Sequence, residues 1–225
     1  MTAAAAAPQT PARMAPRAAA TPGIGQLRMH PVEAALFRAQ LTPPPGCYLE
    51  WGLGGSTAEA LRAGAGLVVS VEGDAAWIAG ARRDAQVVAA QAQGRLRLLH
   101  ADIGPTGDWG TPTDPATAAR WPGYAEAPWA VLAQAGAWPD LVLVDGRFRV
   151  ACCLVLAREA LARRRQAPPR LMLHDFNAKR PHYAAIGIAW RQVDRAGTLR
   201  VFRLRGRVDP AALAAAIASH AQDPR

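Results

Sequence analysis

The residues best suited to chemistry are acids at the ends of short apolar runs. Neighbouring carboxylates can hold a divalent cation, take a proton from a substrate hydroxyl, or bind the ribose hydroxyls of a nucleotide-like ligand. One acid in such a place means little, but five apolar runs that end this way indicate one shared edge of ligand-binding groups. The positions are Glu50, Glu72, Asp102, Asp145 and the pair His174-Asp175.

A glycine-rich turn follows the first of these runs, with the sequence Glu-Trp-Gly-Leu-Gly-Gly-Ser-Thr at 50–57. Glycine lacks a Cβ atom, and the first N–H groups of a helix favour polar or anionic groups, so a ligand can lie against bare backbone here. The same residues would also make an ordinary tight turn between packed elements. The dinucleotide pattern needs a third glycine five positions after Gly52, where Thr57 stands, so that pattern fails.

The elements that would position these acids alternate between strand and helix. Such alternation predicts an α/β fold with a mostly parallel sheet, in which the carboxyl ends of the strands meet at one edge. The first expected strand begins at residue 47, and the next four span 66–72, 96–102, 140–145 and 170–175. A hairpin of two strands, 188–195 and 198–205, follows them. The expected helices span 31–37, 56–62, 74–91, 124–136, 148–165 and about 180–186, and a last helix follows Asp209.

Two segments stand apart from this alternation. Residues 1–29 are rich in Ala and Pro and contain arginines but no acid. That composition is also typical of transit leaders, but the prolines break any amphipathic helix, so we expect a disordered tail before one domain at 30–225. Residues 103–123 are dense in Gly, Pro, Thr and Trp, which predicts a mobile lid.

Composition and charge limit the possible partners. The formal charge of +9 permits an acidic partner, but the arginines are scattered along the chain, which argues against nucleic acid. Cys47, Cys152 and Cys153 all lie in apolar runs, which predicts buried thiols in a reducing, cytoplasmic compartment. No apolar run approaches the length of a membrane span. The oligomeric state stays open.

Taken together, Glu-x-Gly-x-Gly-Gly at 50–55, Glu72 20 residues after Gly52, and the final hairpin resemble class I S-adenosylmethionine (SAM)-dependent methyltransferases. The resemblance implies a Rossmann-like, seven-stranded, mostly parallel sheet with an antiparallel last strand and helices on both faces. It also implies that Glu72 binds the ribose of SAM and Asp102 its adenine amine. The cofactor-binding residues expected from it are Glu50, Gly52, Gly54, Gly55, Ser56, Glu72, Asp102 and Ile103. Leu53 departs from the family pattern, because a small polar residue is common there.

A narrower likeness rests on three further segments. They are Gly-Pro-Thr-Gly-Asp-Trp-Gly at 104–110, Val-Asp-Gly-Arg-Phe-Arg-Val-Ala-Cys at 144–152, and His-Asp-Phe at 174–176. Together they look like a little-characterised group of bacterial methyltransferase-like proteins. This likeness implies the fold and the cofactor but no substrate.

The resemblance places the chemistry after the fourth and fifth strands, at Asp145, His174 and Asp175. In metal-dependent O-methyltransferases, carboxylates in these positions hold a divalent ion that lowers the pKa of the substrate hydroxyl. Asp145, Asp175 and Asn177 would then be oxygen ligands for Mg²⁺ or another divalent cation. His174 is alternatively a general base, or simply a hydrogen-bonded histidine at the end of a strand.

Candidate substrate-binding residues lie near the same edge. Arg147, Arg149 and Arg180 can pair with a carboxylate or phosphate, although a helix start and a loop exposed to solvent would also place arginines there. Trp109 and Tyr124 can line a pocket or stack on a sugar ring, and loop aromatics also serve as packing plugs.

The leading hypothesis is therefore a SAM-dependent O-methyltransferase that acts on a small-molecule or carbohydrate-like substrate, acidic if the arginines bind it. A nucleic-acid methyltransferase is the alternative enzyme, but the chain lacks an Asn/Asp-Pro-Pro-aromatic motif after the fourth strand and a Pro-Cys nucleophile. A non-catalytic binding module with the same fold is the third hypothesis, because a cofactor pocket does not prove turnover.

Overall fold

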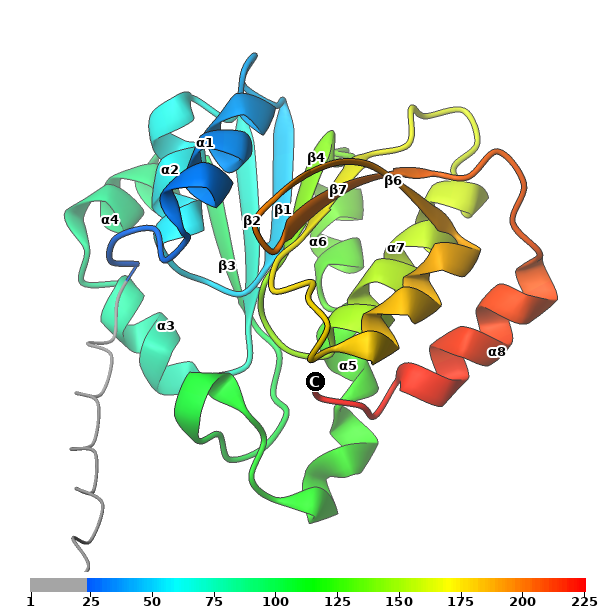
Figure 1. The fold of residues 1–225 in the computed structure, drawn as a ribbon. Helices are drawn as coiled ribbons and strands as arrows, with labels where there is room; N and C mark the ends of the chain where they lie inside the picture. Colours follow the sequence, from blue (N-terminus) through cyan, green and yellow to red (C-terminus); the bar gives the residue numbers. More distant parts are fainter. Residues whose placement is uncertain (1–23) are drawn as a thin grey trace, which may run out of the picture.

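The computed structural model describes residues 24–225, and within them seven strands form one sheet in the order β3-β2-β1-β4-β5-β7-β6 (Figure 1). Strands β1 to β5 are parallel, whereas β7 is antiparallel to β5 and β6 is antiparallel to β7. The strand order reverses between β1 and β4, where sheets of this kind bind ligands. The bounds are Cys47–Trp51 (β1), Leu67–Glu72 (β2), Leu96–His100 (β3), Leu141–Val144 (β4), Arg170–Leu173 (β5), Trp190–Ala196 (β6) and Leu199–Leu204 (β7). The predicted sheet is confirmed.

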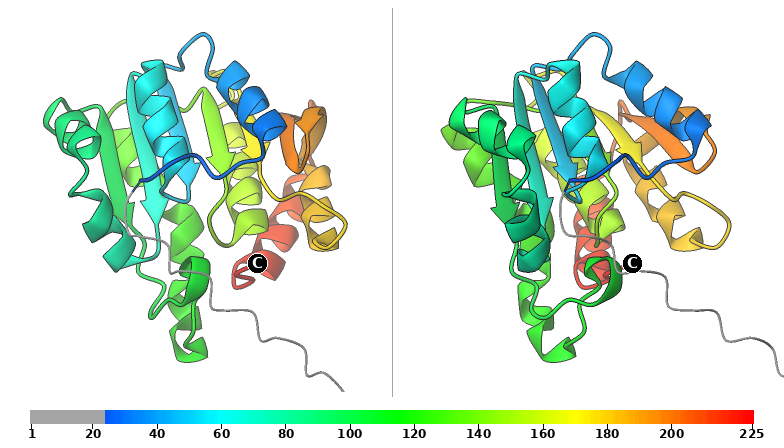
Figure 2. Two further views of the ribbon diagram at one scale, coloured as in Figure 1. Left: turned by 60° about the vertical axis from the view of Figure 1, so that its left-hand side comes forward. Right: turned by 90° about the vertical axis from the view of Figure 1, so that its left-hand side faces the viewer.

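Helices cover both faces of the sheet (Figures 1 and 2). One layer contains α1 (Pro31–Gln40), α2 (Gly55–Ala63), α3 (Ala75–Ala81) and α4 (Ala85–Ala92), and the other contains α5 (Pro122–Glu126), α6 (Pro128–Gln134), α7 (Arg149–Ala162) and α8 (Pro210–His220). Successive side chains of a strand point to opposite faces, so Tyr48 packs with the first layer and Leu49 with the second. Short 3₁₀ helices occupy Asp108–Gly110 (η1), Pro115–Arg120 (η2) and Pro181–Ile188 (η3).

Three predicted helices differ in the structure. The stretch 74–91 is two helices, because Asp84 accepts hydrogen bonds from the N–H groups of Gln86 and Val87 and so starts a new one. The stretch 124–136 divides before Pro128, which lacks an N–H to continue the first helix. The helix expected near 180–186 is the 3₁₀ helix η3.

The amino-terminal part of the described chain packs on the domain. Ile24 is only 2% exposed, and the backbone of Gln26 and Leu27 lies against Gly55 at the start of α2. The domain therefore begins before residue 30, the boundary expected from the sequence. Residues 1–23, most of the predicted disordered tail, lie outside the described residues.

The predicted lid at 103–123 has local structure of its own. The Ile103 carbonyl accepts hydrogen bonds from Thr117 Oγ1 and Trp121 Nε1, and Thr106 forms an isolated β-bridge with Pro112. Its mobility stays a prediction. Within residues 24–225, no helix is both long and apolar enough to cross a membrane. The three cysteines are buried free thiols, as expected.

Candidate active site

The carboxyl ends of β1 and β4 meet where the strand order reverses. The N–H groups of Asp145 and Gly146 both donate to the carbonyl of Trp51, at 2.9 and 2.7 Å. Gly52 has a φ of +110°, and a Cβ atom on it would lie 2.7 Å from the Gly146 nitrogen. A side chain at Gly52 would therefore push the two strand ends apart, so this glycine is required for the architecture itself.

Glu50 supports the glycine turn from below. Its side chain is fully buried and accepts hydrogen bonds from Tyr48 Oη (3.0 Å), Ser56 Oγ (2.7 Å) and Thr57 Oγ1. Burial raises the pKa of Glu50 to about 7, although the hydroxyl donors favour the charged form. Glu50 and Ser56, expected to bind a cofactor, thus hold the first turn of α2 in place and face the protein interior.

The other two glycines of the turn have different surroundings. A Cβ atom on Gly54 would meet nothing within 4 Å, so open space lies beside its backbone. A Cβ atom on Gly55 would lie 2.3 Å from the backbone of Gln26 and Leu27. Gly54 is therefore the glycine that leaves room for a ligand beside its Cα atom, while its N–H donates to Thr57 Oγ1 at 3.1 Å. Gly55 packs against the amino-terminal segment.

Glu72 lies at the end of β2, next to the turn. Its Oε2 accepts a hydrogen bond from the Leu53 N–H (3.2 Å), and its Oε1 accepts from Gly73 (2.7 Å) and Asp74 (2.9 Å). Burial raises the pKa of Glu72 despite these three donors. A carboxylate has about four acceptor positions, so Oε2 retains one for a ribose hydroxyl. The residues at this end of the sheet fit the nucleoside part of SAM.

The residues expected to contact adenine lie beyond β3. The Asp102 side chain is 58% exposed and pairs with Arg120 at 2.8 Å, while Ile103 is fully buried and touches Gly73. Trp109 is 68% exposed, and the guanidinium of Arg28 lies 5.6 Å from its ring. A Cβ atom on the neighbouring Gly110 would lie 3.5 Å from Glu72 Oε1, and Trp109 is not among the residues that line a pocket with Arg147 and Arg180.

A continuous chain of charged groups crosses the ends of β4 and β5. His174 Nε2 lies 3.2 Å from Glu33 Oε2 of α1, and its Nδ1 lies 3.0 Å from Asp145 Oδ1. The Arg149 guanidinium, only 7% exposed, reaches both Asp145 (3.2 Å) and Asp175 (3.1 Å). The structure thus brings Asp145, His174 and Asp175 together, as expected from the sequence.

The state of His174 follows from its partners. Burial alone would lower the pKa of His174, but the carboxylates of Asp145, Asp175 and Glu33 raise it to about 9. Both ring nitrogens then carry protons at neutral pH and donate to carboxylates. A histidine in this state has no free nitrogen with which to accept a proton from a substrate, so the geometry does not suit a general base.

Arg149 is an internal cation, although the sequence suggested a role in substrate binding. Besides the two carboxylates, it donates to the carbonyls of Gly146 (2.9 Å), His174 (2.8 Å) and Asp145 (2.9 Å). Every face of this guanidinium that can bind an anion is already occupied. Burial of Asp145 works against its charged form, but Arg149 and His174 still hold the pKa of this carboxyl below its usual value.

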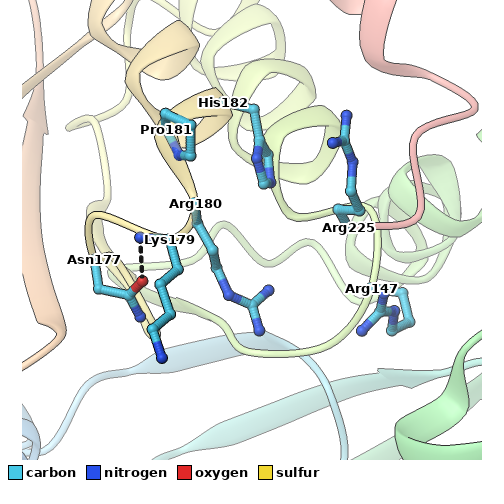
Figure 3. Close-up of a pocket in the computed structure, with 7 residues that line it drawn as sticks. All are labelled: Arg147, Asn177, Lys179, Arg180, Pro181, His182 and Arg225. Carbon is cyan, nitrogen blue, oxygen red and sulfur yellow. Dashed lines mark hydrogen bonds between the residues drawn. The ribbon is translucent and has the colours of Figure 1, made fainter.

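This arrangement does not fit the divalent metal expected at Asp145, Asp175 and Asn177. Ligand atoms of Asp145, His174 and Asp175 do lie within 4.8 Å of one another. However, the Arg149 guanidinium already lies against both carboxylates, at 3.2 and 3.1 Å, and a divalent ion between them would face this cation at close range. Asn177 Oδ1 accepts a hydrogen bond from the Lys179 N–H at 2.9 Å and faces the loop after β5 (Figure 3).

An open pocket of about 740 Å³ borders this charged chain (Figure 3). Arg180 belongs both to its wall and to the chain, because its Nη2 lies 3.5 Å from Asp175 Oδ2. Tyr124 does not line the pocket, because it is buried and its hydroxyl packs against Gly146. The lining residues are Arg147, Asn177, Lys179, Arg180, Pro181, His182 and Arg225.

Sequence reasoning missed Glu33 and the additional pocket residues. Glu33 looks like an ordinary first-turn acid of α1, yet it accepts hydrogen bonds from Thr198 in the turn between β6 and β7 and contacts His174. No local sequence pattern predicts a contact between residues as far apart in the sequence as Glu33 and His174. Lys179 carried a weak signal, because it is the single lysine among 26 basic residues.

The strand order and the two layers of helices are those of class I methyltransferases. A methyltransferase-like protein from Silicibacter pomeroyi DSS-3 has a similar structure, with a TM-score of 0.68 and 29% sequence identity over 88% of this chain and 98% of that one. A putative O-methyltransferase from Klebsiella pneumoniae has a TM-score of 0.48 and 16% identity over 79% and 82% of the two chains. A putative methyltransferase from Escherichia coli has the same score and identity over 84% and 92%. No protein-family model and no curated protein matches the chain.

Proposed function

We propose that this protein is a SAM-dependent methyltransferase that methylates a hydroxyl group of a small molecule. The observation that carries the proposal is the Glu72 carboxylate, fixed by three backbone N–H groups beside the open backbone of Gly54. A carboxylate in that place can accept a ribose hydroxyl while the exposed turn receives the rest of the cofactor. The likeness to a methyltransferase-like protein over nearly the whole chain supports methyl transfer as the activity.

The chemistry belongs to Asp175, Asp145 and His174 in this proposal. Asp175 is the most exposed of the three side chains, at 36%, and only its Oδ2 is held by Arg149 and Arg180. Its Oδ1 accepts no hydrogen bond from the described residues, and its nearest cationic neighbour is His174 Nδ1 at 3.9 Å, so it is available to take the proton of an acceptor hydroxyl as the methyl group arrives. His174 and Asp145 fix the position of Arg149 and so of Asp175. Methyl transfer needs little else from the protein beyond alignment of the two reactants.

Transfer of radiolabelled methyl from SAM to a panel of hydroxyl-bearing compounds tests this function. Asp175→Asn keeps the shape of the side chain but removes the proton acceptor, so we expect kcat to fall by about 10²-fold or more with unchanged SAM affinity. Asp194→Asn, an exposed position on β6, is the matched control and should retain the parent rate. Parent-like turnover by Asp175→Asn would place the chemistry elsewhere.

A non-catalytic binding module would share the cofactor site. It differs in one measurable respect, because it would bind SAM and its demethylated product without consuming SAM in the presence of any acceptor. The protonated His174 and the balanced carboxylates are compatible with a static network, so turnover is the decisive measurement.

A further inference from the structure

The pocket beside Asp175 gathers more positive charge than its surroundings balance. Lys179 and Arg180 extend from the loop after β5, and Arg147 faces them from the loop after β4 (Figure 3). Arg225, also on the wall, is paired with Asp223 at 2.8 Å. The pocket thus combines cations from loops that follow two adjacent strands.

The acids nearby do not compensate this charge. Asp175 is shared between Arg180 at 3.5 Å and Arg149 at 3.1 Å, so it is already balanced. Within residues 24–225, neither Arg147 nor Lys179 forms an ion pair. Two uncompensated positive charges therefore face one open space, an arrangement that favours a ligand with two negative charges.

Two buried polar atoms of the wall also lack partners. Arg147 Nε and His182 Nε2 are inaccessible to solvent and make no hydrogen bond to any described residue. Burial, and the proximity of Arg149 and Arg180, lower the pKa of Arg147, which shows that its surroundings work against its charge. Arg147 is half-buried, and its guanidinium has no acidic partner among the described residues, so an anionic ligand at its open side would offset the cost of its partial burial.

We propose that this pocket binds a phosphate monoester group carried by the methyl acceptor. A phosphate dianion matches the two uncompensated cations in charge, and guanidinium groups bind its oxygens through paired hydrogen bonds. A volume of about 740 Å³ holds the phosphate together with a body of the size of a sugar. This inference rests on the proposed methyltransferase function, and it names the substrate class as a phosphorylated hydroxy compound.

The position of the pocket gives the phosphate a role in alignment. Arg180 contacts Asp175, the proposed proton acceptor, and also lines the pocket. A phosphate held by Arg147, Lys179 and Arg180 would therefore place a hydroxyl of the same molecule next to Asp175 Oδ1. Such anchoring of a remote group is an effective way to orient a reacting atom.

Calorimetric titration without SAM tests the site by itself. The titrants are inorganic phosphate, glucose 6-phosphate and malonate, in chloride buffer at constant ionic strength. We expect saturable binding of phosphate and of the ester, and much weaker binding of malonate. Absence of saturable phosphate binding would overturn the proposal, malonate binding as tight as phosphate would assign a dicarboxylate instead, and exclusion of the ester would remove the role in substrate anchoring.

Variants locate the binding. Lys179→Gln and Arg147→Gln should each weaken phosphate binding by about tenfold or more, since each removes a charged donor. Lys179 is exposed and its side chain makes no hydrogen bond to the described residues, so its replacement leaves the fold intact. Arg165→Gln, on an exposed arginine beyond α7, is the matched control. An equal loss in that control would show general charge attraction and overturn the proposal.

A parallel titration with SAM separates this inference from the proposed function. Phosphate binding without SAM binding would contradict the methyltransferase assignment while supporting the anion site. SAM binding without phosphate binding would support the cofactor site and overturn the substrate class.

Discussion

The two halves of the sheet edge hold their acids in opposite ways. On the β1–β2 side, Glu50 and Glu72 are bound by hydroxyl and backbone N–H donors, and burial raises the pKa of both. On the β4–β5 side, Asp145 and Asp175 are bound by Arg149, and the pKa of Asp145 is lowered. For Glu50 and Glu72, neutral donors do not fully offset the rise in pKa that burial causes, whereas for Asp145 the Arg149 cation does.

This difference matches two tasks. In the proposed function, the first half presents the backbone of the glycine turn to a cofactor and needs little charge of its own. The second half is a network of alternating charges that fixes Asp175 and ends at a cationic pocket. If the comparison holds, variants in the second half should cost stability through electrostatics, and variants in the first half should act on ligand access.

The largest effect is expected at Arg149. Arg149→Met leaves two carboxylates facing each other and three carbonyls without their donor, so we expect a loss of about 4 kcal/mol in the free energy of unfolding. Arg158→Met is the matched control on the same helix, because its pair with Glu126 is exposed to solvent and should contribute less than about 1 kcal/mol. Urea denaturation measures both. Equal losses would break the comparison between a buried network and a surface pair.

The pH dependence of stability should separate the two halves. The pKa of His174 is raised from 6.5 to about 9 in the folded state, so its contribution is complete below pH 6.5 and is lost as the pH rises through 9. The contribution of the raised His174 pKa to the free energy of unfolding is about 3 kcal/mol. The pKa of Glu50 is raised from 4.5 to about 7, so its contribution to the free energy of unfolding is complete below pH 4.5 and is lost as the pH rises through 7.

Two glutamine variants assign these windows. His174→Gln should flatten the fall in unfolding free energy between pH 6.5 and 9, and Glu50→Gln should flatten it between pH 4.5 and 7. Denaturation at a series of pH values measures both, and each variant serves as a control for the other. A parent-like slope above pH 7 in His174→Gln would refute the protonated state assigned to that histidine.

A smaller effect is expected where the amino-terminal segment covers the first half. Ile24→Ala should lower the free energy of unfolding by about 2 kcal/mol, since the side chain is 2% exposed. Val32→Ala, at a residue that is 51% exposed, should change it by less than about 0.5 kcal/mol. A negligible effect at Ile24 would restore residue 30 as the start of the domain.

The order of the elements was predictable from the sequence because each strand and helix has a local pattern. The closeness of Asp145, His174 and Asp175 was also predictable, since adjacent parallel strands bring their carboxyl ends together. The roles of individual residues were less predictable from the sequence. Arg147 and Arg149 look equivalent in Gly-Arg-Phe-Arg, yet Arg149 is buried between carboxylates and Arg147 lines the pocket. Contacts across the fold, such as Glu33 to His174, decide these roles and leave no local signal.

Gly54 offers the most direct test of whether a SAM molecule lies against the backbone of the glycine turn. A methyl group at Gly54 would meet no protein atom within 4 Å and would project into the proposed cofactor space. A methyl group at Gly206 would also meet no protein atom within 4 Å, but this exposed residue follows β7 and is not part of the glycine turn, so it serves as the control. In calorimetric titrations with SAM, we expect the parent and Gly206→Ala to bind alike and Gly54→Ala to bind at least tenfold more weakly, a difference of about 1.4 kcal/mol. Equal affinity in all three proteins, or no SAM binding by the parent, would contradict the account.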